Sequence, residues 1–260
     1  MTIFDDINTS TDLPVVSTVS PSLHPAMLIE PGKILAADDS PATAAAYKAA
    51  RAAQGLLYNG LSLIEDAHRT TQEQHSEKLV VDGKSIRGEI NDQQKQILAN
   101  AMGDAFNAVA TKFDSHLGTV TTTQENLEAT IAKQLLPPKQ DATTAVAASD
   151  LRKIVASQAD PMGYLASCIR DQDVEVIHSV LCTSPRASGL SKEQFATLKE
   201  MAAEAFTPKE TAQLKAIKQV REALLRSATV FTSRYGKLLP VVKPTPANVA
   251  RENLKTKAGA

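Results

Sequence analysis

The chain has 260 residues, of which 43% are hydrophobic and 4% aromatic, and it contains no tryptophan. Much of the hydrophobic fraction is alanine, so bulky apolar side chains are scarce for a chain of this length. This composition argues against a dense aromatic core and a pocket-rich enzyme, and it favours helices over sheets. No apolar run approaches the roughly 18 residues of a membrane span, so we expect no membrane partner.

The formal net charge of −1 hides an asymmetry between the two ends of the chain. Residues 1–40 hold six acidic residues against Lys33 alone, whereas residues 207–260 hold eleven lysines and arginines against three glutamates. Such a distribution suits head-to-tail contacts between identical copies, or a tail that meets nucleic acid. The alternative is that both ends are simply solvated.

Residues 1–39 are predicted to form an extended arm. Serine, threonine and four prolines (Pro14, Pro21, Pro25 and Pro31) oppose a helix there, and bulky apolar residues are isolated. Alone, such a segment cannot bury enough apolar surface to offset its ordering entropy. We therefore expect something outside the chain to hold it. The first 20 residues also lack the cationic and apolar regions of a signal peptide, so we expect a protein of the virion or host cytoplasm.

Residues 40–136 are predicted to form a long-helix domain. Ser40 and Pro41 supply an N-cap and a proline at N1 for a helix that runs to about His75. Two adjacent stripes give this helix a wide face, and the first half of that face consists of small residues that let a partner helix approach closely. A β-hairpin is expected near residues 78–90, because Asp82-Gly83 fits a tight turn.

Two further helices are expected in this domain. One starts at Asn91 or Asp92 and ends at Gly118, and the other spans residues 122–136 before Pro137-Pro138. Residues 137–148 then read as a linker. Residues 149–236 are predicted to form a second helical subdomain, closed by Gly236, and residues 237–260 a basic C-terminal tail. Within residues 149–236, the expected helix starts are Ser149-Asp150, Asp160-Pro161, Asp171, Ser191 and Thr207-Pro208.

Together these elements predict an all-α fold: a long helical hairpin with a small β-ribbon, a second helical subdomain, and extended N- and C-terminal arms.

Two Glu-x-x-His pairs are the most interesting chemical motif, namely Glu65 with His68 and Glu175 with His178. This spacing points both side chains inward from one helix face, as in the two-metal carboxylate centres of helical bundles. Such centres also need a lone glutamate from each of two other helices, and no candidate glutamate lies on an apolar stripe. The alternative is that neither histidine binds a metal: His68 ends a heptad stripe, and His178 is an ordinary helix residue.

His178 and Cys182 lie four residues apart, so a thiol–imidazole pair is conceivable. No orienting third group is recognisable, and a small packed cysteine is the better reading. Arg221 falls inside the apolar stripe of the last helix. It either extends to the surface or pairs with an acid across an interface.

The basic C-terminal region could contact nucleic acid. Aromatic residues that could stack on bases are missing there, apart from Tyr235. Contacts would therefore be nonspecific, to phosphates, and sensitive to salt. The candidate residues are Arg234, Lys237, Lys243, Arg251, Lys255 and Lys257.

The sequence thus favours a non-enzymatic structural protein, without catalytic residues or cofactor, that forms homo-oligomers and contacts other structural proteins of an assembly. Helical faces and terminal arms would make these contacts, and a tailed-phage virion is the expected setting. The alternative is a secreted or regulatory helical protein, such as a type III secretion substrate. A two-metal helical bundle is the more distant alternative.

Overall fold

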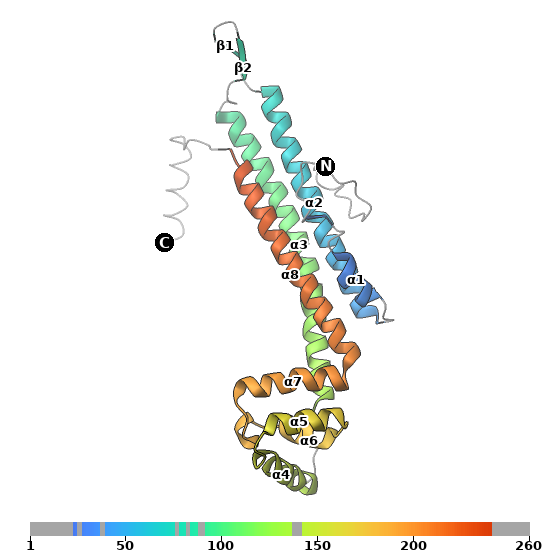
Figure 1. Cartoon of the computed structure of the whole chain (residues 1–260). Helices are drawn as coiled ribbons and strands as arrows, with labels where there is room; N and C mark the ends of the chain where they lie inside the picture. The colour runs from blue at the N-terminus through green and yellow to red at the C-terminus, as the bar shows by residue number, and fades with distance from the viewer. Residues whose placement is uncertain are drawn as a thin grey trace, which may run out of the picture. The chain divides into compact units, whose positions relative to one another are not determined.

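The computed structural model describes residues 23–24, 28–36, 40–75, 78–81, 84–87, 92–136 and 142–240. These residues are predominantly helical, as the composition predicts (Figure 1). Within these ranges, no helix is long and apolar enough to cross a membrane. The elements are α1 (Ile29–Ala36), α2 (Pro41–His75), β1 (Lys78–Val81), β2 (Lys84–Arg87), α3 (Asp92–Gln134), α4 (Ala142–Ala156), α5 (Pro161–Arg170), α6 (Val174–Leu181), the short 3-10 helix η3 (Pro185–Ser188), α7 (Lys192–Phe206) and α8 (Pro208–Leu238).

The chain divides into two compact units. Unit 1 takes its described residues from 1–28, 49–117 and 223–260, and unit 2 from 29–48 and 118–222. The division therefore falls within the long helices α2, α3 and α8, whereas the sequence suggested a linker at 137–148. A one-dimensional pattern cannot show that the second half of α8 packs beside α2 and α3, because that pairing joins residues more than a hundred positions apart.

Unit 1 is built around α2, which lies beside α3 and the C-terminal part of α8 (Figure 1). Both stripes that the sequence indicates on α2 are buried from Ala50 to Ile64, in the part that belongs to this unit, except for half-buried Leu63. The predicted close approach is confirmed at Gly60: a Cβ placed there would lie 2.7 Å from a methyl carbon of Val109 on α3. The partner of this small-residue face is a helix of the same chain.

Aromatic stacking and a buried hydrogen bond complete unit 1. The ring of Phe106 on α3 stacks on Phe231 and Tyr235 of α8, at centroid distances of 5.5 and 4.4 Å. The Gln54 side chain, 1% exposed, donates a 2.9 Å hydrogen bond to the Ser227 hydroxyl of α8. The strands β1 and β2 also belong to this unit and pair antiparallel, with Lys78 opposite Arg87 and Val81 opposite Lys84.

The expectation of an extended arm is wrong for the N-terminal residues that the structure describes. Residues 29–36 form helix α1, and Pro31 is accommodated because it lies in the first turn, where its missing N–H has no partner to lose. Leu23, Leu28 and Leu35 are fully buried by this chain itself. Residues 1–22, 25–27 and 37–39 lie outside the described residues.

Two predicted helix ends are also wrong. Helix α3 continues through Gly118 to Gln134, so the two helices expected there are one, and α8 passes Gly236 to Leu238. One glycine costs a helix interior only about 1 kcal/mol, which the packing of neighbouring turns offsets. Val120 and Thr123, just beyond Gly118, are buried. The proline pair at 137–138 does follow the end of α3, as expected.

The second half of the expected linker is helical. Residues 142–148 form the first turns of α4, since alanine has the highest helix propensity and Ala148 is buried. The predicted helix start at Ser149-Asp150 is therefore wrong, and α6 begins at Val174, capped by Asp173 rather than Asp171. The predicted starts of α5 and α7 are confirmed by their caps. Asp160 accepts a hydrogen bond from the Gly163 amide at α5, and Ser191 and Gln194 form the expected capping box of α7.

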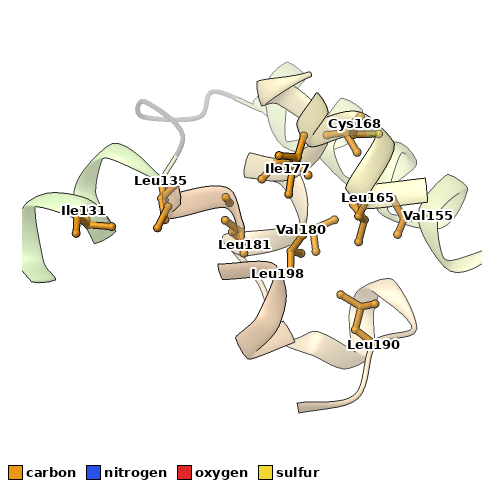
Figure 2. Close-up of a cluster of buried hydrophobic side chains, with 14 residues drawn as sticks. Ile131, Leu135, Val155, Leu165, Cys168, Ile177, Val180, Leu181, Leu190 and Leu198 are labelled. Carbon is orange, nitrogen blue, oxygen red and sulfur yellow. The ribbon is translucent and has the colours of Figure 1, made fainter. Parts of the chain in front are cut away.

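Unit 2 contains a cluster of buried apolar side chains that joins several of its helices (Figure 2). Ile131 and Leu135 enter it from the end of α3, Leu181 from the end of α6, and Leu198 from α7. Cys168 of α5 is also buried in the cluster, which matches its reading as a small core residue. The cluster holds α5 and α6, which are 10 and 8 residues long and too short to be stable alone, against the end of α3.

We expect Gly60→Ala to destabilise the protein by about 1 kcal/mol or more. The new methyl group meets Val109, whose side chain is stiff in a helix, and overpacking outweighs the gain in helix propensity. Gly118→Ala is the control, because a Cβ there meets nothing within 4 Å. It should gain up to about 1 kcal/mol. Urea unfolding followed by circular dichroism measures both changes, and an equal gain in both variants would contradict the tight α2–α3 contact.

Candidate functional site

The first Glu-x-x-His pair belongs to unit 1 and contacts groups that are not metal ligands. One carboxylate oxygen of Glu65 accepts a 3.3 Å hydrogen bond from Arg234 of α8. The His68 ring lies 3.4 Å from the Gln72 amide, and burial lowers the pKa of His68. Glu65 is thus part of an ion pair that joins α2 to α8.

The second pair belongs to unit 2. Glu175 is exposed in the first turn of α6, whereas half-buried His178 makes a hydrogen bond with the backbone of Gln134, and burial lowers its pKa. Across the described ranges, no group of three or more histidine, cysteine or acidic residues is placed to hold a metal ion. Within its own unit, neither Glu-x-x-His pair is joined by a third such ligand among the described residues.

The cysteines show no nucleophilic arrangement. The Cys182 thiol donates to the Ser179 carbonyl at 3.3 Å and lies 3.8 Å from a guanidinium nitrogen of Arg152. The hydrogen bond of His178 goes to Gln134 instead. Burial raises the pKa of Cys168 above its ordinary value, which disfavours the reactive thiolate.

Of the predicted phosphate-contacting residues, the structure describes Arg234 and Lys237. Arg234 forms the ion pair with Glu65 and is 44% exposed, and Lys237 is exposed in the last turn of α8. Lys243, Arg251, Lys255 and Lys257 lie outside the described residues. Contact between this region and nucleic acid stays a prediction.

Unit 2 contains a pocket that sequence reasoning missed. It has a volume of ≈ 710 Å³ and opens onto the buried cluster of Figure 2. Its floor is apolar and comes from α3, from the residues that follow α3, and from α6, α7 and α8. The apolar lining residues are Ile131, Ala132, Leu135, Leu136, Leu181, Ala203 and Leu214. Each has an apolar signature in the sequence, but no sequence signal shows that their inner surfaces leave a space.

The charged side chains that line the pocket join its walls. Lys218 of α8 bonds to Glu128 of α3 at 2.9 Å, and Lys215 of α8 bonds to Glu204 of α7. Beside them, the hydroxyls of Thr207 and Thr211 both donate to the carbonyl of Ala203, at 2.8 and 3.0 Å. These bonds tie α8 to both α3 and α7.

Arg221 lies on α8, one turn beyond the pocket-lining Lys218. The hydrogen bond from Lys218 lowers the pKa of Glu128, with smaller contributions from the Gln124 amide and the charge of Arg221. Arg221 is half-buried, and its Nε atom is buried without a hydrogen-bond partner. Neither reading from the sequence is decided: the side chain is only partly exposed, and the ion pair of Glu128 is made with Lys218.

Comparison with known proteins identified no relative. No protein-family model matches the chain, and no curated protein or solved structure matches it.

We expect Glu65→Gln to leave stability at pH 7 unchanged or raised. Desolvation raises the pKa of Glu65 above its ordinary value of 4.5 and outweighs the opposing effect of Arg234. The folded state therefore binds the proton more tightly than the unfolded state, so the contribution of Glu65 to stability falls as pH rises from about 4.5 through the raised pKa. Thermal unfolding at pH 4 and pH 7 measures the difference between the variant and the natural chain.

Glu128→Gln is the matched control, with the opposite sign. Its lowered pKa stabilises the folded state above the ordinary value of 4.5, and this stabilisation is lost as pH falls through the lowered pKa. Glu128→Gln should therefore destabilise at pH 7 and less so in acid. If Glu65→Gln also destabilises at pH 7, the ion pair with Arg234 outweighs desolvation and our interpretation of Glu65 is wrong.

Proposed function

We propose that this chain is a non-enzymatic structural protein that self-associates through exposed helix faces within a larger assembly. The outer face of α4 supports this proposal best. Val146 is 62% exposed and Ile154 is 47% exposed, on a helix that packs against unit 2 through its other side. Single exposed apolar residues are ordinary, but two on one face of a short helix indicate a contact surface.

The geometry of α4 separates its two faces. At 100° per residue, Val146, Asp150, Lys153 and Ile154 fall within one sector of about 100°. The buried residues Ala148 and Val155 lie on the opposite side. The exposed sector is therefore available within this unit.

The charges of the exposed sector neutralise each other. Lys153 and Asp150 form a 2.9 Å ion pair between the two apolar residues. Because the sector carries no net charge, it can meet the same sector of a second copy without like-charge repulsion. An isologous dimer contact of this kind requires a self-complementary patch, and apolar groups flanked by both signs of charge meet that requirement.

A self-associating helical subunit needs no catalytic site, and its setting in a tailed-phage particle stays a prediction. The described leucines of the N-terminal segment are buried by their own chain. The prediction that terminal arms contact other copies therefore concerns only residues outside the described ranges.

Light scattering coupled to size-exclusion chromatography tests this proposal. We expect the natural chain to show a mass that is a multiple of 27.8 kDa. The double variant Val146→Lys, Ile154→Glu keeps the net charge but buries two charges in the proposed contact. It should shift the mass toward that of one chain while circular dichroism stays helical.

The control places the same two charges elsewhere, as Gln219→Lys and Thr229→Glu at exposed positions of α8. This variant should keep the oligomer. A mass of 27.8 kDa for the natural chain across the accessible concentration range would refute self-association and favour the export-substrate alternative, which predicts a monomer. An oligomer that survives the α4 substitutions would refute the assignment to this face.

A further inference from the structure

We propose that the pocket of unit 2 is a binding site for an uncharged, largely apolar small molecule. Three properties of the described residues carry this inference: the size of the pocket, the way its walls are held, and the pairing of its charges. It is independent of the self-association proposed for α4, because the residues of that face do not line the pocket.

The size is that of a small-molecule site. A volume of ≈ 710 Å³ lies within the range of roughly 300–1,000 Å³ that is typical of ligand pockets in proteins. A second copy of the chain suits the site less well, because a concave surface cannot fill its own counterpart in an isologous contact. The shape therefore favours a compact, convex occupant.

The walls are held in place without a ligand. The Lys218–Glu128 bond ties α8 to α3, and the Lys215–Glu204 bond ties α8 to α7. The two threonine hydroxyls on the Ala203 carbonyl fix the turn between α7 and α8. Such links hold α8 against α3 and α7 around the pocket, so the ligand need not supply the free energy to open it.

The charges favour a neutral ligand. The lining holds three lysines and three glutamates, and two pairs of these are bonded to each other. A third lysine, Lys199, lies 5.1 Å from the ring centroid of Phe195. The remaining glutamate, Glu200, balances the charge of Lys199, so the lining carries no net charge and attracts neither an anion nor a cation over a neutral ligand.

The hydrogen-bonding groups of the lining also favour an uncharged, largely apolar ligand. The Thr211 hydroxyl already donates to the Ala203 carbonyl, and the remaining floor is aliphatic. Leu136, 49% exposed, extends the apolar surface to the edge of the pocket. A ligand of this pocket would thus gain affinity from burying apolar surface rather than from directed hydrogen bonds.

A pair of related fluorescent probes tests the site. N-phenyl-1-naphthylamine is neutral, and 1-anilinonaphthalene-8-sulfonate has the same ring system with an added sulfonate. We expect the neutral probe to bind the full-length natural protein saturably with one site per chain, and the sulfonate to bind at least about tenfold more weakly.

Filling the pocket should abolish this binding. Ala132 is an exposed lining residue on α3, so Ala132→Phe can enter the pocket without disturbing the core. This substitution should weaken the affinity for the neutral probe by about tenfold or more. Thr130→Phe is the matched control, because exposed Thr130 lies two residues away, on the opposite side of the same helix. Circular dichroism of both variants reports that they are folded.

Three outcomes would overturn the proposal. The first is the absence of saturable binding of the neutral probe, which would leave apolar side chains of a protein partner as the alternative occupant. The second is tighter binding of the sulfonate than of the neutral probe. The third is an equal loss of binding in Thr130→Phe and Ala132→Phe, which would place the probe elsewhere.

Discussion

Close approach of helices through small side chains is the constraint on which unit 1 depends. The chain has few bulky apolar residues, so its helices gain contact area by lying near one another rather than by interleaving large side chains. Gly60 lets Val109 of α3 approach the backbone of α2. The few large rings then gather at the α3–α8 contact, where Phe106 stacks on Phe231 and Tyr235. Helix α2 accordingly combines an alanine-rich stretch with a leucine-rich stretch.

Polar groups inside unit 1 determine which helices pair. The Gln54–Ser227 hydrogen bond and the Glu65–Arg234 ion pair both join α2 to α8. A buried polar group is costly without its partner, so an alternative register of α8 would leave these groups unsatisfied. Their contribution is therefore to specificity more than to stability. The raised pKa of Glu65 fits this view, because it shows that burial disfavours the charged form.

Unit 2 buries its apolar side chains in a different way from unit 1. Short helices surround one apolar cluster, and ion pairs and threonine hydrogen bonds tie α8 to its neighbours at the edge of that cluster. The walls tied in this way leave a pocket over the cluster, while the outer face of α4 presents Val146 and Ile154. The two surfaces have different shapes. A concave site suits a small apolar molecule, and a convex helix face suits a second copy.

The sequence by itself determined the helical character, the start of α2 at Pro41 and the caps of α5 and α7, because proline, capping side chains and apolar spacing act within a few residues. It also marked the buried face of α2. Only the tertiary structure decided that α3 continues through Gly118, that Leu28 and Leu35 are buried by their own chain, and that Glu128 pairs with Lys218. The pocket belongs to the same group, since a void depends on how several helices meet, and each helix in isolation shows only an ordinary apolar stripe.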